Sequence, residues 1–209
     1  MIIKAAWVVP ILAPPIRDGF VEIAGQRILR VGPAELLQRH ARLDGASGED
    51  QAPAGAPDAD MPVCDLGQAI ITPGLVNPHT HLELTAYAGM LEPAPFWKWI
   101  EKLVVLRRKS GRREREGRGA TEGAWQSLRA GVTCVGDISR ENVSWVALKD
   151  VPIRKVCFVE LLSLADQPPR NPAELRTAVA EVEEDELLTA GVTPHAPYTV
   201  SSEHIRAAL

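Results

Sequence analysis

The sequence predicts an α/β fold, in which a β-rich segment precedes about four β-strand–α-helix units on a parallel sheet. Two observations carry this prediction. Residues 1–43 alternate short apolar runs with turns, as consecutive strands do. After residue 63, apolar runs of strand length alternate with segments whose apolar residues recur at helical spacing. Strands and helices that alternate along a chain build a parallel sheet covered by helices.

The β-rich segment begins with the apolar run IIKAAWVV, which we expect to be a strand. It continues with GFVEIAGQRILRVGP, in which two apolar pairs flank a Gly-Gln turn and predict a β-hairpin. Residues 44–62 consist largely of Ala, Pro, Gly and Asp and offer little to bury. That composition predicts a flexible surface loop.

The first strand–helix unit opens with QAIITPGLVNPHTH, which we interpret as one strand. The following FWKWIEKLVVLRRK has helical spacing of its apolar residues, namely Phe96, Trp99, Ile100, Leu103 and Val104. A second helix is expected to end at Gly131 as its C-cap and to run directly into the strand VTCVGDI.

Three more helices and two more strands follow in the same alternation. A short helix in NVSWVALKD leads to the strand IRKVCFVELLSL. Asn171 as N-cap and Pro172 in the first turn predict the next helix. Its apolar stripe would consist of Leu175, Val179 and Val182. The strand ELLTAGVTPHAP and a helix beginning at Ser201 complete the pattern.

Composition and charge exclude several classes of function. The 209 residues are 45% hydrophobic and 24% charged, a balance that predicts a packed globular core. A net charge of -4 gives no basic face for nucleic acid, and no apolar stretch is long enough to span a bilayer. An odd number of cysteines, three, far apart, favours a reducing compartment, so we expect a cytoplasmic protein. One arginine cluster is interrupted by glutamates and is predicted to be a solvated helix-and-loop segment; it comprises Arg107, Arg108, Arg112, Arg113, Arg115 and Arg118.

His79 and His81 are the residues most suggestive of chemistry. Residues two apart in a strand point to the same face, so both imidazoles would leave the carboxyl end of one strand together. Parallel α/β folds place their active sites at that end. Two neutral imidazoles suit Zn²⁺ or Fe²⁺. The spacing alone also fits two histidines in a polar turn.

Three segments resemble the amidohydrolase superfamily of metal-dependent hydrolases. ITPGLVNPHTHLE resembles its first barrel strand, GVTCVGDIS its second, and VTPHAPYTVS the end of the fourth strand in the deaminase branch. That branch includes deaminases of cytosine, guanine, adenosylhomocysteine and aminofutalosine, together with triazine hydrolases. The resemblance implies that residues 71–209 form the N-terminal portion of a (β/α)8 TIM-like barrel, about four units long. It also implies a partial β-sandwich domain over residues 1–70.

The resemblance assigns roles to individual residues. His79 and His81 match ligands of one divalent metal ion, zinc or alternatively iron. His195 matches a histidine that contacts the substrate; the alternative is a hydrogen-bonded histidine that closes a strand. Asp137 would support the metal site or cap a turn. Glu83 would orient a ligand histidine or form a plain salt bridge.

Other residues refine or fall outside the resemblance. Glu160 stands near the position where some adenosylhomocysteine deaminases carry a substrate-binding arginine, which points instead toward an aminofutalosine-like subgroup. Trp97 and Trp99 are candidates for a pocket mouth, although tryptophans more often anchor cores or loops. His40 and His204 match nothing in the pattern and receive no role.

The implied activity is hydrolysis of a non-peptide C–N bond, most simply deamination of a nucleobase-like or amidine-bearing small molecule. The alternatives are triazine hydrolysis, opening of an imidazolone-like ring, or a non-catalytic metal-binding or assembly module. The remaining metal ligand and the catalytic acids of the family would follow Leu209, so the 209-residue chain is expected to bind metal weakly and to turn over little substrate. We expect a small-molecule partner, neither nucleic acid nor membrane, and leave a homo-oligomer open.

Overall fold

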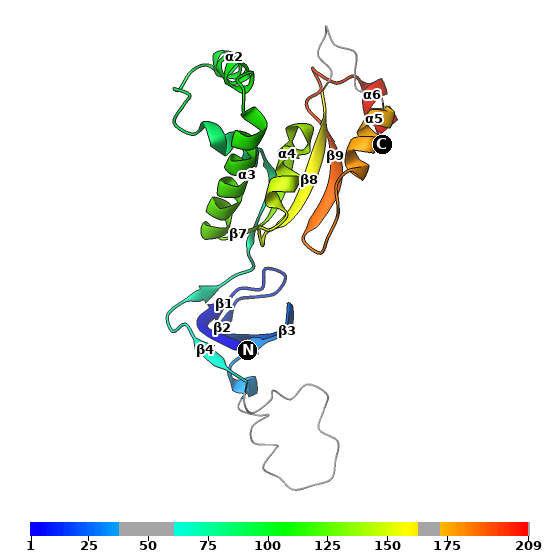
Figure 1. Ribbon diagram of the computed structural model, residues 1–209. Helices are drawn as coiled ribbons and strands as arrows, with labels where there is room; N and C mark the ends of the chain where they lie inside the picture. The colour runs from blue at the N-terminus through cyan, green and yellow to red at the C-terminus, as the bar shows by residue number, and fades with distance from the viewer. Residues whose placement is uncertain (38–60, 163–171, 209) are drawn as a thin grey trace. The chain divides into compact units, whose positions relative to one another are not determined.

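The computed structural model describes residues 1–37, 61–162 and 172–208. It divides into two compact units, Met1–Pro73 and Gly74–Leu209, which are described separately here (Figure 1). The predicted loop 44–62 lies outside the described residues, apart from its last two positions.

The first unit is a single five-stranded sheet in the part of the chain that is described. Its order is β3-β2-β1-β4, and the short β5 also pairs with β1. The hairpin prediction is confirmed, because β2 and β3 pair antiparallel and place Ile23 opposite Ile28. A sandwich needs a second sheet, so the partial β-sandwich stays a prediction. The strands are β1 (Ile2–Val8), β2 (Ile16–Ala24), β3 (Arg27–Pro33), β4 (Val63–Asp65) and β5 (Ile70–Ile71).

The prediction of one continuous strand over QAIITPGLVNPHTH is wrong. The segment forms β5 in the first unit and β6 (Leu75–Thr80) in the second, and the boundary between the units falls between Pro73 and Gly74. Pro73 has no N–H to donate to a sheet, which favours an interruption there. A side chain at position 74 would also lie 2.1 Å from the Thr133 hydroxyl, so the close passage requires glycine.

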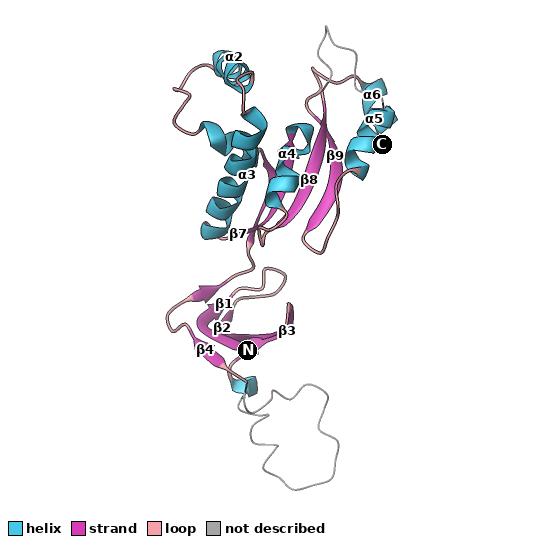
Figure 2. Cartoon of the chain, viewed as in Figure 1, coloured by secondary structure: helices cyan, strands magenta, loops and turns pink. Residues whose placement is uncertain are grey.

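The second unit contains a four-stranded parallel sheet in the order β6-β7-β8-β9 (Figure 2). The three later strands are β7 (Val132–Ser139), β8 (Arg154–Leu161) and β9 (Leu188–Pro194). Each strand therefore lies beside the one that precedes it in the chain. Because all four run in the same direction, their carboxyl ends meet at one edge of the sheet.

Helices cover one face of this sheet, as the alternating sequence pattern predicts. The helical segments of this unit are η1 (Leu82–Tyr87), α2 (Phe96–Arg107), α3 (Arg112–Arg129), η2 (Arg140–Asn142), α4 (Val143–Leu148), α5 (Pro172–Ala180) and α6 (Ser202–Ala208). Those that pack on the sheet are α3, α4, α5 and α6. Gly131 follows α3 with φ 84°, so the predicted C-cap is confirmed. Pro172 opens α5 as predicted, whereas its proposed cap Asn171 lies outside the described residues.

Among the described residues, the two largest of three apolar clusters join the helices to the sheet as follows. The larger contains Val135 of β7, Leu148 of α4 and two alanines of α3, all fully buried. The other lies beneath α5 and α6, where Leu175 packs against Val159 and Leu161 of β8.

The helix predicted over FWKWIEKLVVLRRK is confirmed as α2. Most of its apolar side chains are not buried, since Leu103 is its only buried residue, and Phe96 and Trp97 are 69% and 59% exposed. No helix among the described residues is both long and apolar enough to cross a membrane.

Candidate metal centre

His79 and His81 lie together at the carboxyl end of β6. His79 belongs to the strand, whereas His81 follows it directly and precedes η1. The centroids of their rings are 5.5 Å apart, and the rings are inclined at 78°. Two imidazoles bound to one tetrahedral zinc ion at Zn–N distances of about 2.0–2.1 Å would have centroids roughly 5 Å apart. The pair therefore fits a single ion, and its role as a ligand pair stays a prediction.

The surroundings of His81 favour its neutral form. Burial lowers the pKa of His81, and the positive charges of His79, Arg107 and His195 lower it further. A neutral imidazole is the form that binds metal. The electrostatics and the ring geometry are therefore compatible with the same function.

The sheet register places the histidine pair on the face opposite the helices. Val135 and Leu148 share a buried cluster, which identifies the helix-covered face of β7, and Asp137 points to that same face two residues later. Thr80 pairs with Asp137 and so shares its face. His79, the neighbour of Thr80, lies on the other face, which we call the inner face.

Strands β8 and β9 contribute further side chains to the inner face. Val159 and Leu161 pack beneath α5, so the alternate residues Phe158 and Glu160 face the other way. Glu160 pairs with Thr193 of β9. The carboxyl edge of the inner face thus carries the histidine pair, an aromatic ring, a carboxylate and a hydroxyl.

His195 follows β9 at the same edge. Its backbone N–H donates to the carbonyl of Leu161 at 3.0 Å, and its Nδ1 lies 2.8 Å from the Thr199 hydroxyl oxygen. These hydrogen bonds agree with the interpretation of His195 as a hydrogen-bonded histidine that closes a strand. The charge of His195 also contributes to the lowered pKa of His81, which agrees with the alternative, a histidine that contacts the substrate. Both interpretations of His195 therefore stay predictions.

Asp137 acts as a turn cap beside the histidine pair. Its side chain is fully buried, and its Oδ1 accepts the backbone N–H of Leu82 at 2.7 Å. Burial raises the pKa of Asp137 to about 6, although the hydrogen bonds from Leu82 and Ser144 oppose the rise. Since Asp137 points to the helix-covered face, it supports the chain next to His81 and is not aimed at the inner face.

Glu83 forms a buried salt bridge, the second of the two roles predicted for it. Its carboxylate is 1% exposed and lies 2.5 Å from the Arg107 guanidinium. The same guanidinium contacts Glu116, which is fully buried in α3. Burial would lower the pKa of Arg107, but the two carboxylates outweigh it and raise that pKa above its ordinary value.

The prediction of a solvated arginine cluster is wrong for three of its members, one of which is Arg115, whose guanidinium has two buried nitrogens and lies over the Tyr87 ring. The Arg107 and Arg112 side chains are 12% and 17% exposed and pair with buried Glu116. Arg118 behaves as expected and forms an exposed pair with Glu114. A sequence signal existed, because Glu116 shares the helical face of small buried residues of α3, namely Gly119, Ala120, Gly123 and Ala124.

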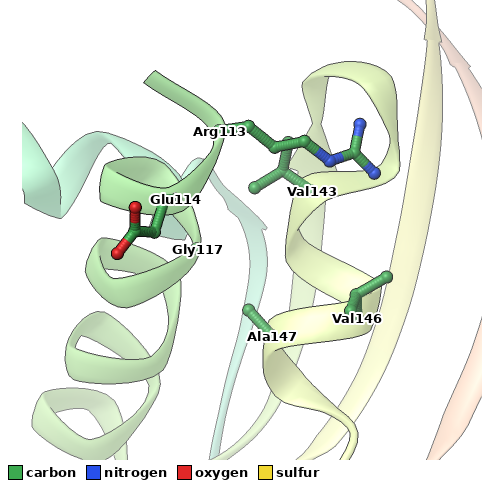
Figure 3. A pocket seen from close by; sticks show the side chains of 6 residues that line it. All are labelled: Arg113, Glu114, Gly117, Val143, Val146 and Ala147. Carbon is green, nitrogen blue, oxygen red and sulfur yellow. The ribbon is translucent and has the colours of Figure 1, made fainter. Parts of the chain in front are cut away.

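A groove of about 370 Å³ lies on the helix-covered side, between α3 and α4 (Figure 3). It is lined by Arg113, Glu114, Gly117, Val143, Val146 and Ala147. Since the histidine pair lies on the opposite face of the sheet, this groove is not part of the candidate metal centre. Neither Trp97 nor Trp99 lines it, and their predicted place at a pocket mouth stays a prediction.

The described residues bring together two candidate ligands and no more. Across 1–37, 61–162 and 172–208, no group of three or more His, Cys, Asp or Glu side chains is arranged to hold a metal ion. All three cysteines are free, and burial raises the pKa of Cys157 to about 12, which disfavours a thiolate ligand there.

The greater part of the chain matches a known protein family. Residues 70–209 match the model of the Amidohydrolase family. The 5-methylthioadenosine/S-adenosylhomocysteine deaminase of Moorella thermoacetica is 28% identical over 211 residues, which cover 98% of this chain and 45% of that protein.

Two solved structures share the fold. The chain superposes on Helicobacter pylori aminofutalosine deaminase, in complex with methylthio-coformycin, with a TM-score of 0.74 at 20% identity, over 99% of this chain and 47% of that one. Atrazine chlorohydrolase of Arthrobacter aurescens, complexed with zinc, gives a TM-score of 0.74 at 18% identity, over 99% and 49%. The predicted fold class, the N-terminal portion of a TIM-like barrel, is confirmed. The chain spans about half the length of these relatives.

Proposed function

Because the chain belongs to the amidohydrolase family, we propose that it provides the first two metal ligands of a hydrolase acting on non-peptide C–N bonds. The observation that carries the proposal is the placement of His79 and His81, whose rings are 5.5 Å apart at the carboxyl end of the first barrel strand. Zinc is the metal we favour, since it suits nitrogen ligands and is present in the related atrazine chlorohydrolase structure.

The residues of this chain would bind the metal and orient the substrate. A divalent metal, when bound, supplies the Lewis acidity that lowers the pKa of water and makes hydroxide available near neutral pH. His79 and His81 would hold that metal through their imidazole nitrogens. His195 lies at the same edge of the sheet, where its ring can contact a substrate or steady developing charge.

The substrate we propose is an adenosine-like compound that loses its exocyclic amino group as ammonia. The curated relative is a deaminase of methylthioadenosine and adenosylhomocysteine, and a structural neighbour is an aminofutalosine deaminase. Glu160 and Thr193 on the inner face offer acceptors for hydroxyl or amino groups of such a substrate. The carboxylate of Glu160 favours an aminofutalosine-like substrate over one that needs a cationic contact there.

Triazine hydrolysis is the second candidate. The triazine enzyme matches the fold with the same TM-score as the aminofutalosine deaminase, so the fold does not separate the two reactions. The sequence relatives favour deamination. The product of any residual activity separates the two: ammonia released from aminofutalosine or methylthioadenosine supports the deaminase, whereas chloride released from a chlorotriazine supports the alternative.

Zinc titration of the purified 209-residue chain, in competition with a colorimetric chelator, tests the proposal. We expect His79→Ala and His81→Ala each to weaken zinc binding at least about tenfold, because loss of a direct ligand costs no less than loss of an outer-shell partner. His204→Ala is the matched control, since His204 bonds only locally to Ser201. Equal zinc affinity in all three variants would refute the proposal.

A second measurement separates the enzyme from a non-catalytic metal-binding module. Catalytic zinc sites use three protein ligands and a water, and the described residues provide two. We therefore expect weak zinc binding and little turnover from the 209-residue chain. Robust ammonia release by this chain, free of host enzymes, would contradict that expectation. Zinc-dependent self-association without any turnover would favour the assembly module.

A further inference from the structure

A chain of alternating charges connects the first two loops at the carboxyl edge of the sheet. We call the residues Glu83, Arg107, Glu116, Arg112 and Glu141 the charge chain. Glu83 follows His81 by two residues, and Glu141 lies in η2, directly after β7. Between them, α2 and α3 contribute the two arginines and the central glutamate.

Glu116 is the centre of the charge chain. Its carboxylate is fully buried and accepts hydrogen bonds from Arg112 at 2.9 Å, from Arg107 at 3.1 Å and from the Tyr87 hydroxyl at 2.8 Å. The outer contacts join Arg107 to Glu83 at 2.5 Å and Arg112 to Glu141. A buried carboxylate requires such partners, because an unpaired one would be strongly disfavoured.

The segment that follows His81 is also packed tightly against α3. A Cβ at Gly119 would lie 2.5 Å from the backbone nitrogen of Ala86, and one at Gly123 would lie 2.5 Å from the Thr85 hydroxyl. These close approaches fix η1 on the helix from which Glu116 projects. Movement of α3 would therefore be transmitted to the histidine loop.

The far end of the charge chain reaches a strained loop. Glu141 and Asn142 have φ values of 56° and 54°, which residues other than glycine adopt rarely. Arg112 holds the Glu141 side chain, and the Asn142 amide donates to the carbonyl of Ala178 in α5 at 2.7 Å. Such strain persists where the surroundings enforce it, often near functional sites.

We propose that the charge chain positions the histidine loop relative to the loop after β7, with Arg107 and Arg112 as positioning residues for the metal centre. This inference rests on the proposed function, because it gives the charge chain a role toward a metal held by His79 and His81. Stability alone is a weak explanation, since buried ion pairs seldom stabilise more than well-packed apolar side chains of similar volume. The charge chain instead fixes the relative orientation of the segments that it joins. Each guanidinium has several donors in one plane and therefore holds two carboxylates in one geometry.

The test compares Arg107→Gln and Arg107→Lys with an exposed control. Arg118→Gln is the matched control, because the Arg118 side chain is 70% exposed and forms a surface pair with Glu114 on α3, the helix that carries Glu116. We expect Arg107→Gln to weaken zinc binding by about 10–100-fold, as other losses of outer-shell partners do. Arg107→Lys keeps the charge but loses the planar fork, so its zinc affinity should lie between those of Arg107→Gln and the unaltered protein.

A spectroscopic measurement separates positioning from general destabilisation. The visible absorption of Co²⁺ bound in place of zinc depends on the arrangement of its ligands, and unfolding by urea reports stability independently. We expect the cobalt spectrum to change in Arg107→Gln at concentrations where the protein is fully folded. The Arg118→Gln spectrum should match that of the unaltered protein.

The outcomes distinguish this inference from the proposed function. Loss of zinc binding in His79→Ala, combined with unchanged affinity and cobalt spectrum in folded Arg107→Gln, would overturn the positioning role alone. Unchanged zinc binding in His79→Ala would overturn the proposed function. If Arg107→Gln does not fold, Arg107→Lys decides, and an unaltered zinc affinity there would overturn the inference.

Discussion

Glu116→Gln should destabilise the second unit strongly. The substitution keeps the volume of the side chain but removes the charge that faces two guanidinium groups, while the carboxylate is fully buried. Removing one partner of a buried ion pair costs about 3–5 kcal/mol. Since domains are stable by about 5–15 kcal/mol, the variant would fold but lose a large fraction of its stability.

Urea and thermal unfolding, followed by tryptophan fluorescence, measure this loss. Most of the tryptophans report on the second unit, namely Trp97, Trp99, Trp125 and Trp145. A change of 3–5 kcal/mol corresponds to a fall of about 6–20 °C in Tm for a protein of this size. Glu114→Gln is the control, because Glu114 is 77% exposed and its surface pair should contribute little. A loss below about 1 kcal/mol in Glu116→Gln would refute the reasoning.

Two further predictions concern packing and pH. Gly117→Ala should stabilise α3 by up to about 1 kcal/mol, because its Cβ would meet nothing closer than 3.7 Å. Gly119→Ala on the same helix should destabilise by about 1–3 kcal/mol, because its Cβ would collide with the backbone of Ala86; equal urea midpoints for the two variants would contradict this. Burial raises the pKa of Asp137 from 3.8 to about 6. As the pH rises, Asp137 therefore loses its proton at a lower pH in the unfolded protein than in the folded protein. The free energy of unfolding of the metal-free protein should therefore fall by about 3 kcal/mol in all between about pH 3 and about pH 7. Asp137→Asn keeps an acceptor for the Leu82 N–H and should lack this part of the fall, whereas an unchanged pH profile would show that Asp137 does not cause it.

The order of strands and helices was predictable because each element carries its own local pattern. Gly131 ends a helix since only glycine adopts φ 84° easily, and Pro172 opens one since its missing N–H is not needed there. The division of the strand at Pro73 was missed, because apolar residues continue on both sides and the pattern does not show that they join different sheets. Helical spacing predicted α2 but could not predict that Phe96 is exposed, because the spacing does not show which element covers an apolar face.

The candidate site was predictable in part. The proximity of His79 and His81 follows from spacing within one strand, and the structure places their rings 5.5 Å apart. The contacts of Arg107 did not follow, because Glu83 and Glu116 lie on different elements and only the packing of η1 against α3 brings them together. Local patterns therefore predicted the ligands, whereas the ion pairs that surround them depend on tertiary structure.

X-ray absorption of the zinc-loaded protein tests the central claim most directly. If His79 and His81 bind the zinc ion, we expect nitrogen scatterers at about 2.0–2.1 Å with the multiple scattering of two imidazole rings. The double variant His79→Ala, His81→Ala should lose that imidazole signal, and the control variant His204→Ala should keep it. A zinc spectrum that shows no imidazole, or that is the same in the double variant, would contradict the account.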